Sequence, residues 1–359
     1  MLTSIILLAA ILVTDWFNQI LGHQGLISYI LIAIIFGMLT RNTVGVPDKF
    51  QPGIGFALRK LLRLGIILLG IRLSVIDVAV IGAWGIPIIV GCIMTGLIAT
   101  IFLNSKLKLP DRLGILIAVG TSICGASAIV ATAPTIKATD EEVSYAVANI
   151  TVFGIVAMLL YPYLAHFLFN GTIVQVGLFT GTSIHETAQV AGAGLIYDQT
   201  FGVTGNPNVT DIAVVTKLVR NMMMVIIIPG MAFLYARNLL ANKESVETEA
   251  ISVLKLVPLF IFGFLLMAVI RSVGDANVSN GALAFGIWGP SEWETLYTNI
   301  KSLSGYILAA AMAGVGLGTS FRTMKGLGLK PFGVGLIAAM MVGVVSIILV
   351  MTLGPMVQI

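Results

Sequence analysis

The residues with the clearest capacity for chemistry are two cations inside a hydrophobic run. Residues 211–235 read like a membrane-spanning helix, yet they contain Lys217 and Arg220, with Asn221 directly after. Charged groups within the hydrocarbon of a bilayer are costly, so they usually mark a functional site. Spacings of three and four residues place the three side chains on one helical face. We therefore predict that they bind a substrate anion, because a guanidinium can hold a tetrahedral oxyanion through paired donors.

Structural roles for the same cations are the alternative. Either cation could form an ion pair with an acid such as Glu186, or extend its chain to the membrane interface. With a rise of ~1.5 Å per residue from Asp211, Lys217 would lie roughly 9 Å and Arg220 roughly 14 Å deep in a hydrocarbon core of ~30 Å. Reaching the interface is therefore easier for the lysine than for the arginine.

A second group of candidates surrounds the tripeptide Gly-Thr-Ser, which occurs at 120–122, 181–183 and 318–320. The first two copies continue alike, as GTSICGASAIVATA and GTSIHETAQVAGAG. Small polar residues of this kind either permit close helix packing or interrupt a helix and expose its backbone donors. Their recurrence favours an interruption, which would add these predicted substrate-binding residues: Gly120, Thr121, Ser122, Cys124, Gly125, Ser127, Gly181, Thr182, Ser183, His185 and Gln189.

The second copy also carries a titratable pair, His185 and Glu186. On an unbroken helix, Thr182, His185 and Gln189 would share one face. A carboxylate such as that of Glu186, inside a membrane-spanning segment, requires a neighbouring cation or a bound proton. We predict that Glu186, together with His185, couples anion binding to protons or sodium. A neutral His185 packed among helices is the alternative.

The composition indicates what must position these residues. Of 359 residues, 58% are hydrophobic and 10% are charged, and the mean hydropathy is +1.03. These values exclude a soluble domain and predict an all-α polytopic membrane protein. The hydrophobic start of the chain has no basic segment before it, so it is interpreted as a retained helix rather than a signal peptide. Cys92, Cys124 and three histidines lack metal-ligand spacing, so no metal, cofactor or catalytic residue is predicted.

Windows of apolar residues predict about eleven transmembrane helices. They lie near residues 2–21, 26–40, 61–76, 78–103, 112–136, 142–169, 173–196, 210–235, 253–272, 302–321 and 332–356. Loops after the second, fourth, eighth and tenth helices hold most of the basic residues, whereas the opposite loops include Asp140, Glu141 and Glu142. The positive-inside rule therefore predicts a cytoplasmic N-terminus and an external C-terminus.

Helix direction suggests a repeat. The fifth and tenth helices, which both contain Gly-Thr-Ser, run in opposite directions, as an inverted repeat requires. We predict a single transporter domain over 1–359, with an extra N-terminal helix at 1–25, a first five-helix repeat at 26–169 and a second at 173–359. The closer likeness, however, joins the fifth and seventh helices, which run the same way unless one is re-entrant.

Four segments together resemble the YeiH-like sulfate exporter family, the UPF0324 membrane proteins. They are LLGIRLS (68–74), GTSICGASAIVATAP (120–134), GTSIHETAQVAGAG (181–194) and TKLVRN (216–221). The resemblance covers nearly the whole chain and implies kinship with sodium/proton antiporters and bile-acid transporters. It also implies inverted repeats, two broken helices that cross near the midplane, and a core domain that moves against a panel domain.

The residues and the resemblance together predict a secondary active transporter of a small anion, either sulfate or an organosulfonate. Both export and import are compatible with this prediction, and the resemblance implies export. It would work by alternating access in the bacterial cytoplasmic (inner) membrane. A sodium or other cation/proton antiporter is the alternative in the same class, and an anion channel is the alternative from another class. No nucleophile or metal constellation indicates an enzyme. The predicted partners are the anion and the lipid bilayer, with no nucleic acid, and a homodimer is left open.

Overall fold

The computed structural model describes residues 2–21, 28–241, 256–320 and 328–357, and every regular element in these ranges is a helix. The predicted all-α class is therefore confirmed. Each predicted hydrophobic segment contains helix in its described part, and residues 26–27, 253–255 and 321 of these segments lie outside the described residues. Six helices in the described ranges are long and apolar enough to cross a membrane.

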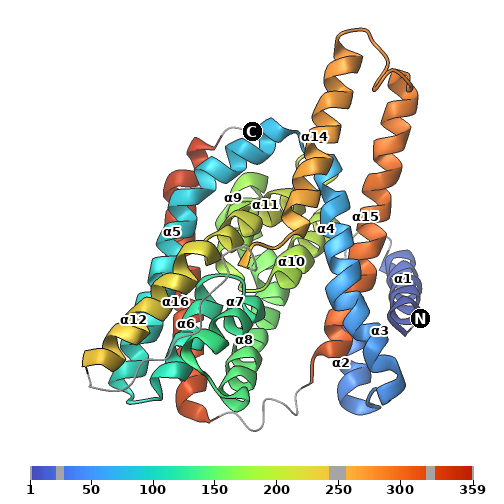
Figure 1. Ribbon diagram of the computed structural model, residues 1–359. Helices are drawn as coiled ribbons and strands as arrows, with labels where there is room; N and C mark the ends of the chain where they lie inside the picture. The colour runs from blue at the N-terminus through green and yellow to red at the C-terminus, as the bar shows by residue number, and fades with distance from the viewer. Residues whose placement is uncertain (1, 22–27, 242–255, 321–327, 358–359) are drawn as a thin grey trace.

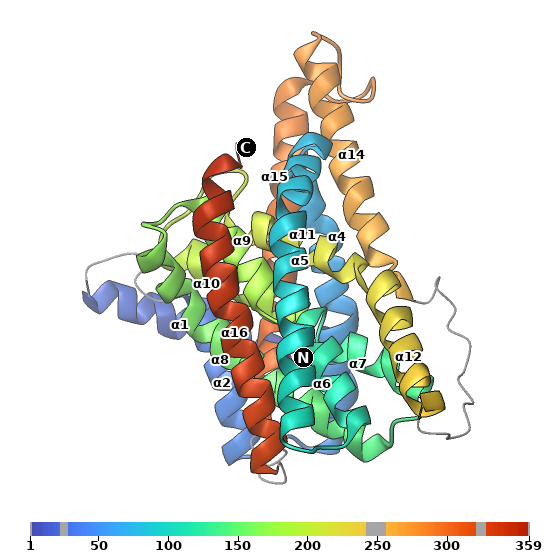
Figure 2. The ribbon, with the colours of Figure 1, turned by 90° about the vertical axis from the view of Figure 1, so that its left-hand side faces the viewer.

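The helices form two groups that lie side by side in Figure 1, and Figure 2 looks from the side of the first group described below. The hairpin group consists of α5 (Val75–Lys106), α6 (Asp111–Ser122), α7 (Ala126–Thr132), α8 (Asp140–Leu168), α9 (Ile173–Ser183), α10 (Thr187–Thr200), α11 (Val209–Met222), α12 (Met224–Ala241) and α16 (Leu329–Leu353). The panel group consists of α1 (Leu2–Leu21), α2 (Tyr29–Thr43), α3 (Gln51–Phe56), α4 (Leu62–Leu69), α14 (Phe260–Ser279) and α15 (Pro290–Gly318). Within the panel, Gly37 of α2 and Gly316 of α15 bring two backbones into direct contact, as small residues do in membranes.

The segment with the first Gly-Thr-Ser is a re-entrant hairpin. Helix α6 runs antiparallel to α5, because Gly114 packs on Asn104 and Ser122 packs on Gly96. After a break at Ile123–Gly125 the chain reverses, and α7 returns to the end where α6 began. At that end, Leu113 of α6 and Ile136 belong to one apolar cluster. Ile136 lies in the short 3-10 helix Ala133–Ile136, which directly follows α7. We call this unit the first hairpin.

The segment with the second Gly-Thr-Ser is a hairpin of the opposite orientation. Helix α9 runs parallel to α11, with Gly177 on Ile212 and Gly181 on Thr216. Helix α10 runs antiparallel to α11, with Gly194 on Thr210 and Thr187 bonded to Asn221. Because α9 and α10 run in opposite directions, the chain reverses between them. We call this unit the second hairpin. It follows the C-terminal end of α8, whereas the first hairpin precedes the N-terminal end of α8, so the two hairpins start from opposite ends of that helix.

The breaks therefore differ from the two crossing helices that the resemblance implied. Each broken segment reverses at its break, and the two tips meet. The physical cause is local backbone geometry. Gly125 has φ +71°, a value that favours glycine, and Ile184 and Glu186 are extended, so neither helix can continue. The third Gly-Thr-Ser ends the unbroken helix α15, next to residues outside the described ranges.

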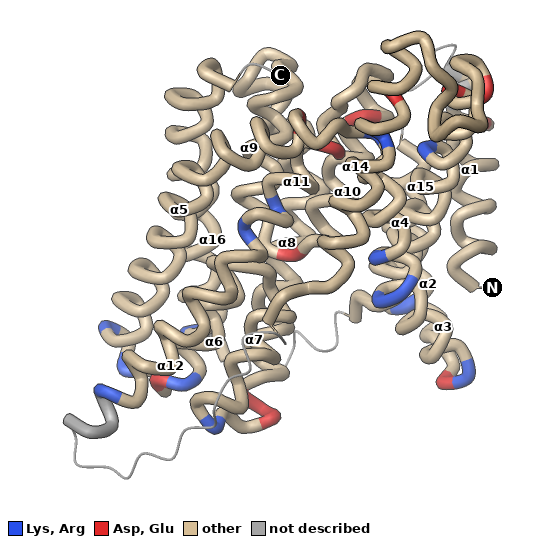
Figure 3. The backbone as a smooth tube through the Cα atoms, turned by 45° about the horizontal axis from the view of Figure 1, so that its top comes forward, with Lys and Arg blue, Asp and Glu red and all other residues tan. Residues whose placement is uncertain are grey.

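The hairpins also correct the predicted side of one loop. Because the first hairpin returns to its starting end, the acidic start of α8, Asp140–Glu142, lies at the same end as the basic end of α5 (Figure 3). The pattern of charges along the sequence predicts these acids on the opposite side. The error arose from counting the hairpin as a helix that crosses the membrane once.

Polar contacts fix the start of α11 against both groups. The Asp198 carboxylate at the end of α10 accepts hydrogen bonds of 3.0 Å from the backbone N–H groups of Val209 and Thr210. Asp211, which is fully buried, forms an ion pair with Arg72, which lies in the turn directly after α4 of the panel group, with 3.1 Å between Nε and Oδ1. These contacts set the position of the helix that carries Lys217 and Arg220.

Candidate functional site

The two hairpin tips are joined by Lys217, which is fully buried. Its Nζ donates to the carbonyl oxygen of Ile123 at 2.8 Å and to that of Ile184 at 2.9 Å. Both acceptors lie just past the C-terminal ends of helices, α6 and α9, where carbonyl groups have no intrahelical partner and the helix dipole favours a cation. Lys217 therefore caps one helix of each hairpin.

Arg220 performs the same task with more donors. Nε donates to the Ser122 carbonyl at 2.8 Å, and Nη2 donates to the Thr121 carbonyl at 2.7 Å. Nη1 donates to the carbonyls of Thr182 at 2.6 Å and Ile184 at 3.3 Å. The guanidinium is fully buried and its three nitrogens are occupied by backbone acceptors. The donors that the sequence analysis assigned to an anion are thus directed at the tips.

The Gly-Thr-Ser residues of both hairpins are buried in helix packing rather than arranged around an open space. The hydroxyls of Thr182 and Ser183 donate to carbonyls of the preceding turn. Gly120 packs against the side chains of Ile129 and Ile150, and Gly181 packs against α11. His185 is 2% exposed and stands at the second break, so it does not share a helical face with Thr182 and Gln189.

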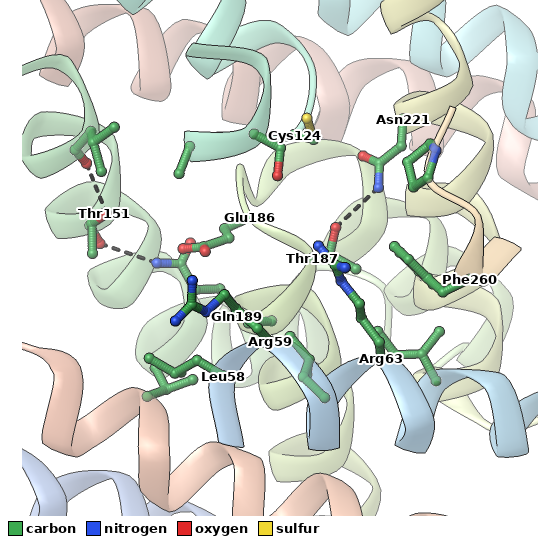
Figure 4. A pocket seen from close by; sticks show the side chains of 18 of the residues that line it. Leu58, Arg59, Arg63, Cys124, Thr151, Glu186, Thr187, Gln189, Asn221 and Phe260 are labelled. Carbon is green, nitrogen blue, oxygen red and sulfur yellow. Dashed lines mark hydrogen bonds between the residues drawn. The ribbon is translucent and has the colours of Figure 1, made fainter. Parts of the chain in front are cut away.

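A cavity of about 470 Å³ lies between the hairpin tips and the panel (Figure 4). Five of the predicted site residues line it: Cys124, Ser127, Glu186, Gln189 and Asn221. The opposite wall comes from residues 58–66, which include the turn after α3 and the start of α4, and from the end of α15. The remaining predicted residues, including Lys217 and Arg220, are not among those that line this space. The cavity is the strongest candidate for a binding site in the described part of the chain.

Two arginines of the panel group face this cavity, and neither is among the site residues predicted from the sequence. Arg59 lies in a π-helical turn, Ala57–Leu61, and Arg63 lies in α4. Arg59 donates to the carbonyl of Gly55, and Arg63 stands 6.0 Å from the ring centre of Phe260. Neither arginine forms an ion pair with a described residue. In the sequence both arginines lie among other basic loop residues, which indicate only the side of the membrane. A π-helical turn often marks a functional site, but the sequence does not reveal it.

The hairpin side of the cavity offers polar groups that lack partners. The Gln189 side chain is 1% exposed and donates to the Thr151 carbonyl, but its Oε1 has no hydrogen-bond partner. The Asn221 side chain is 2% exposed and donates to the Thr187 hydroxyl, but its Oδ1 has no partner either. Helix α10 begins here without a side-chain cap, so its first N–H groups are available to a ligand. The Glu186 carboxylate forms no ion pair within the described ranges, which leaves the predicted pair with Lys217 or Arg220 unformed. Figure 4 shows Glu186, Gln189 and Arg59 pointing into the same space.

Comparison with known proteins finds relatives along nearly the whole chain. Residues 1–335 match a family profile described as Conserved hypothetical protein 698. A UPF0324 membrane protein of Bacillus anthracis is 36% identical over 340 residues, which cover 93% of this chain and 89% of that protein. Proteins of the same description from Fusobacterium nucleatum and Bacteroides thetaiotaomicron are 34% and 33% identical, over 90% and 86% of this chain and 90% and 85% of their own lengths.

Proposed function

This chain belongs to the UPF0324 membrane protein family, and we propose that it is a secondary active transporter of a small anion that works by alternating access. Sulfate and organosulfonates are the proposed substrate class. The observation that carries the proposal is the cavity in which Arg59 and Arg63 face the uncapped start of α10. Two cations and one carboxylate leave a net positive charge, which favours an anion.

The anion site in this proposal differs from the one that the sequence predicted. Arg59 and Arg63 supply the charge, and the first N–H groups of α10 supply donors that need no reorganisation. Lys217 and Arg220 act at a distance, because they hold the two tips together. Their role is to position the residues that line the cavity.

Alternating access follows from where the cavity lies. One wall belongs to the hairpin group and the other to the panel group. A displacement of one group along the other would open this interface toward one side of the membrane and then toward the other. Because Lys217 and Arg220 bind both tips, the hairpins would move as one body.

Glu186 supports coupling to a cation. Its carboxylate lines the cavity without an ion-pair partner in the described part of the chain, so a proton or a sodium ion would relieve the cost of its charge. The same observation favours the second candidate function, a cation/proton antiporter in which the arginines are structural. An anion channel is distinguished from both by flux that does not saturate.

The test is ligand-induced thermal stabilisation of the purified protein, since a ligand that binds the folded state raises its apparent stability. Sulfate, thiosulfate, sulfite, taurine and sulfoacetate would be compared with a sodium and lithium series. We expect stabilisation by at least one sulfur oxyanion, lost in Arg63→Gln and retained in Lys60→Gln, which removes a charge from the same segment outside the cavity. Stabilisation by cations alone would instead favour the antiporter.

A further inference from the structure

A second space adjoins the candidate anion site. It is a groove of about 490 Å³ between α8 and the ends of α2 and α15. Four residues line both spaces: Val147 and Thr151 of α8, Gly318 at the end of α15, and Thr319 after it. The charged cavity and the groove therefore lie next to each other, with these residues at their border.

The groove has a different chemistry from the cavity. No charged residue lines it among the residues that the structure describes, and α8 contributes an apolar wall that includes Val152, Ile155, Val156 and Leu159. Met38 of α2 lies on the opposite side. The apolar wall stabilises an apolar group by removing it from water, and the groove offers hydroxyl groups but no opposite charge to a second charged group.

The cavity and the groove are each larger than an inorganic oxyanion requires. Pockets of roughly 300–1,000 Å³ typically hold a drug-sized ligand, and the cavity and the groove each lie within that range. A tetrahedral anion at Arg59 and Arg63 would leave the shared residues and the whole groove unfilled. The arrangement fits a molecule with an anionic head and an apolar body.

We infer that the transported anion is an amphipathic organic acid, such as an alkyl- or arylsulfonate, whose head binds at Arg59 and Arg63 and whose apolar body lies in the groove along α8. This inference rests on the proposed function and specifies its substrate class. The groove selects the body because it adjoins the charged site and has an apolar wall. A lipid chain would require only the groove and not the arginines.

The experiment is calorimetric titration of the full-length protein in nanodiscs, with empty nanodiscs of the same lipid as background. The probes are sodium alkanesulfonates from methanesulfonate to hexanesulfonate and 1-alkanols of equal chain length. We expect the dissociation constant of the sulfonates to fall about three- to fourfold for each added CH₂ that enters the groove. The alkanols should bind much more weakly, because they lack the charge that Arg63 recognises.

Three variants separate the two parts of the site. Val152→Trp fills the groove and should abolish the chain-length dependence while methanesulfonate still binds. Leu160→Trp, on the same helix but outside both spaces and 60% exposed, should leave the series unchanged. Arg63→Gln should weaken every sulfonate by a similar factor.

Contrary results are distinguishable. Equal affinity for methanesulfonate and hexanesulfonate would overturn the inference and leave the proposed anion transporter intact. Equal binding of hexanesulfonate and 1-hexanol would also overturn it, because the groove would then be a lipid site. If no sulfonate binds and no sulfur oxyanion stabilises the protein, the inference falls together with the function on which it rests.

Discussion

The Lys217 Nζ atom lies 2.8 Å from the carbonyl oxygen of Ile123, at the tip of the first hairpin. The same atom reaches Ile184 at the tip of the second hairpin. Two segments that enter the protein from opposite ends are thus fastened by one ammonium group. Inside a bilayer, an unpaired carbonyl costs several kcal/mol, so these bonds matter more than they would at a surface.

Removing the Arg220 side chain should destabilise the protein. Arg220→Ala leaves the carbonyls of Thr121, Ser122 and Thr182 without their donors. A loss on the order of 3–5 kcal/mol is expected, because each buried carbonyl left without a donor costs about 1–3 kcal/mol. Fluorescence-detected size-exclusion chromatography after heating measures this loss. Arg59→Ala, which removes an exposed arginine from the cavity wall, is the control and should melt like the wild type. Unchanged stability of Arg220→Ala would contradict the capping role.

Gly125 is expected to tolerate no side chain without cost. Its φ of +71° and ψ of −127° lie in a region that L-residues rarely adopt. Gly125→Ala should therefore lower the free energy of unfolding by about 1–3 kcal/mol. Gly53→Ala is the matched control, because an added Cβ there meets nothing within 4 Å. Equal melting temperatures for the two variants would argue against strain at the first tip.

Glu186→Gln should change the pH dependence of transport more than the affinity for the anion. The amide keeps the size and hydrogen-bonding capacity of the carboxyl group but cannot titrate. Uptake into proteoliposomes, measured across a pH series, should lose a pH-dependent step that the wild type shows. Glu141→Gln, at an exposed position near the start of α8, should retain the wild-type profile. A profile that Glu186→Gln leaves intact would place coupling elsewhere.

The ion pair between Arg72 and Asp211 should show strong coupling in a double-mutant cycle. Arg72→Gln leaves the fully buried Asp211 carboxylate without its cation and should cost on the order of 3–5 kcal/mol. Adding Asp211→Asn removes the unpaired charge, so the double variant should recover part of that loss. Melting temperatures of the four proteins measure the coupling. Additive losses would show that the pair contributes little to the position of α11.

Much of the architecture could be read from local sequence. Hydrophobicity along the chain predicts where apolar helices lie, because a segment in lipid must satisfy its own backbone hydrogen bonds. The likeness of the segments around Gly120 and Gly181 correctly singled out two related places, and helices break just after both. The polar residues Glu186, Gln189 and Asn221 were also identified, because such side chains are rare in apolar helices, and all three line the cavity.

Tertiary structure decided what these residues do. Hydrophobicity does not reveal that a broken segment turns back, so the side of Asp140–Glu142 was predicted wrongly. The sequence indicated that Lys217 and Arg220 need anionic or polar partners, but not that backbone carbonyls of two distant hairpins supply them. It also could not indicate that Arg59 and Arg63, far away along the chain, face the same cavity. The residue types determine that buried charged side chains require hydrogen-bond or ion-pair partners. Only packing in three dimensions determines which groups are those partners.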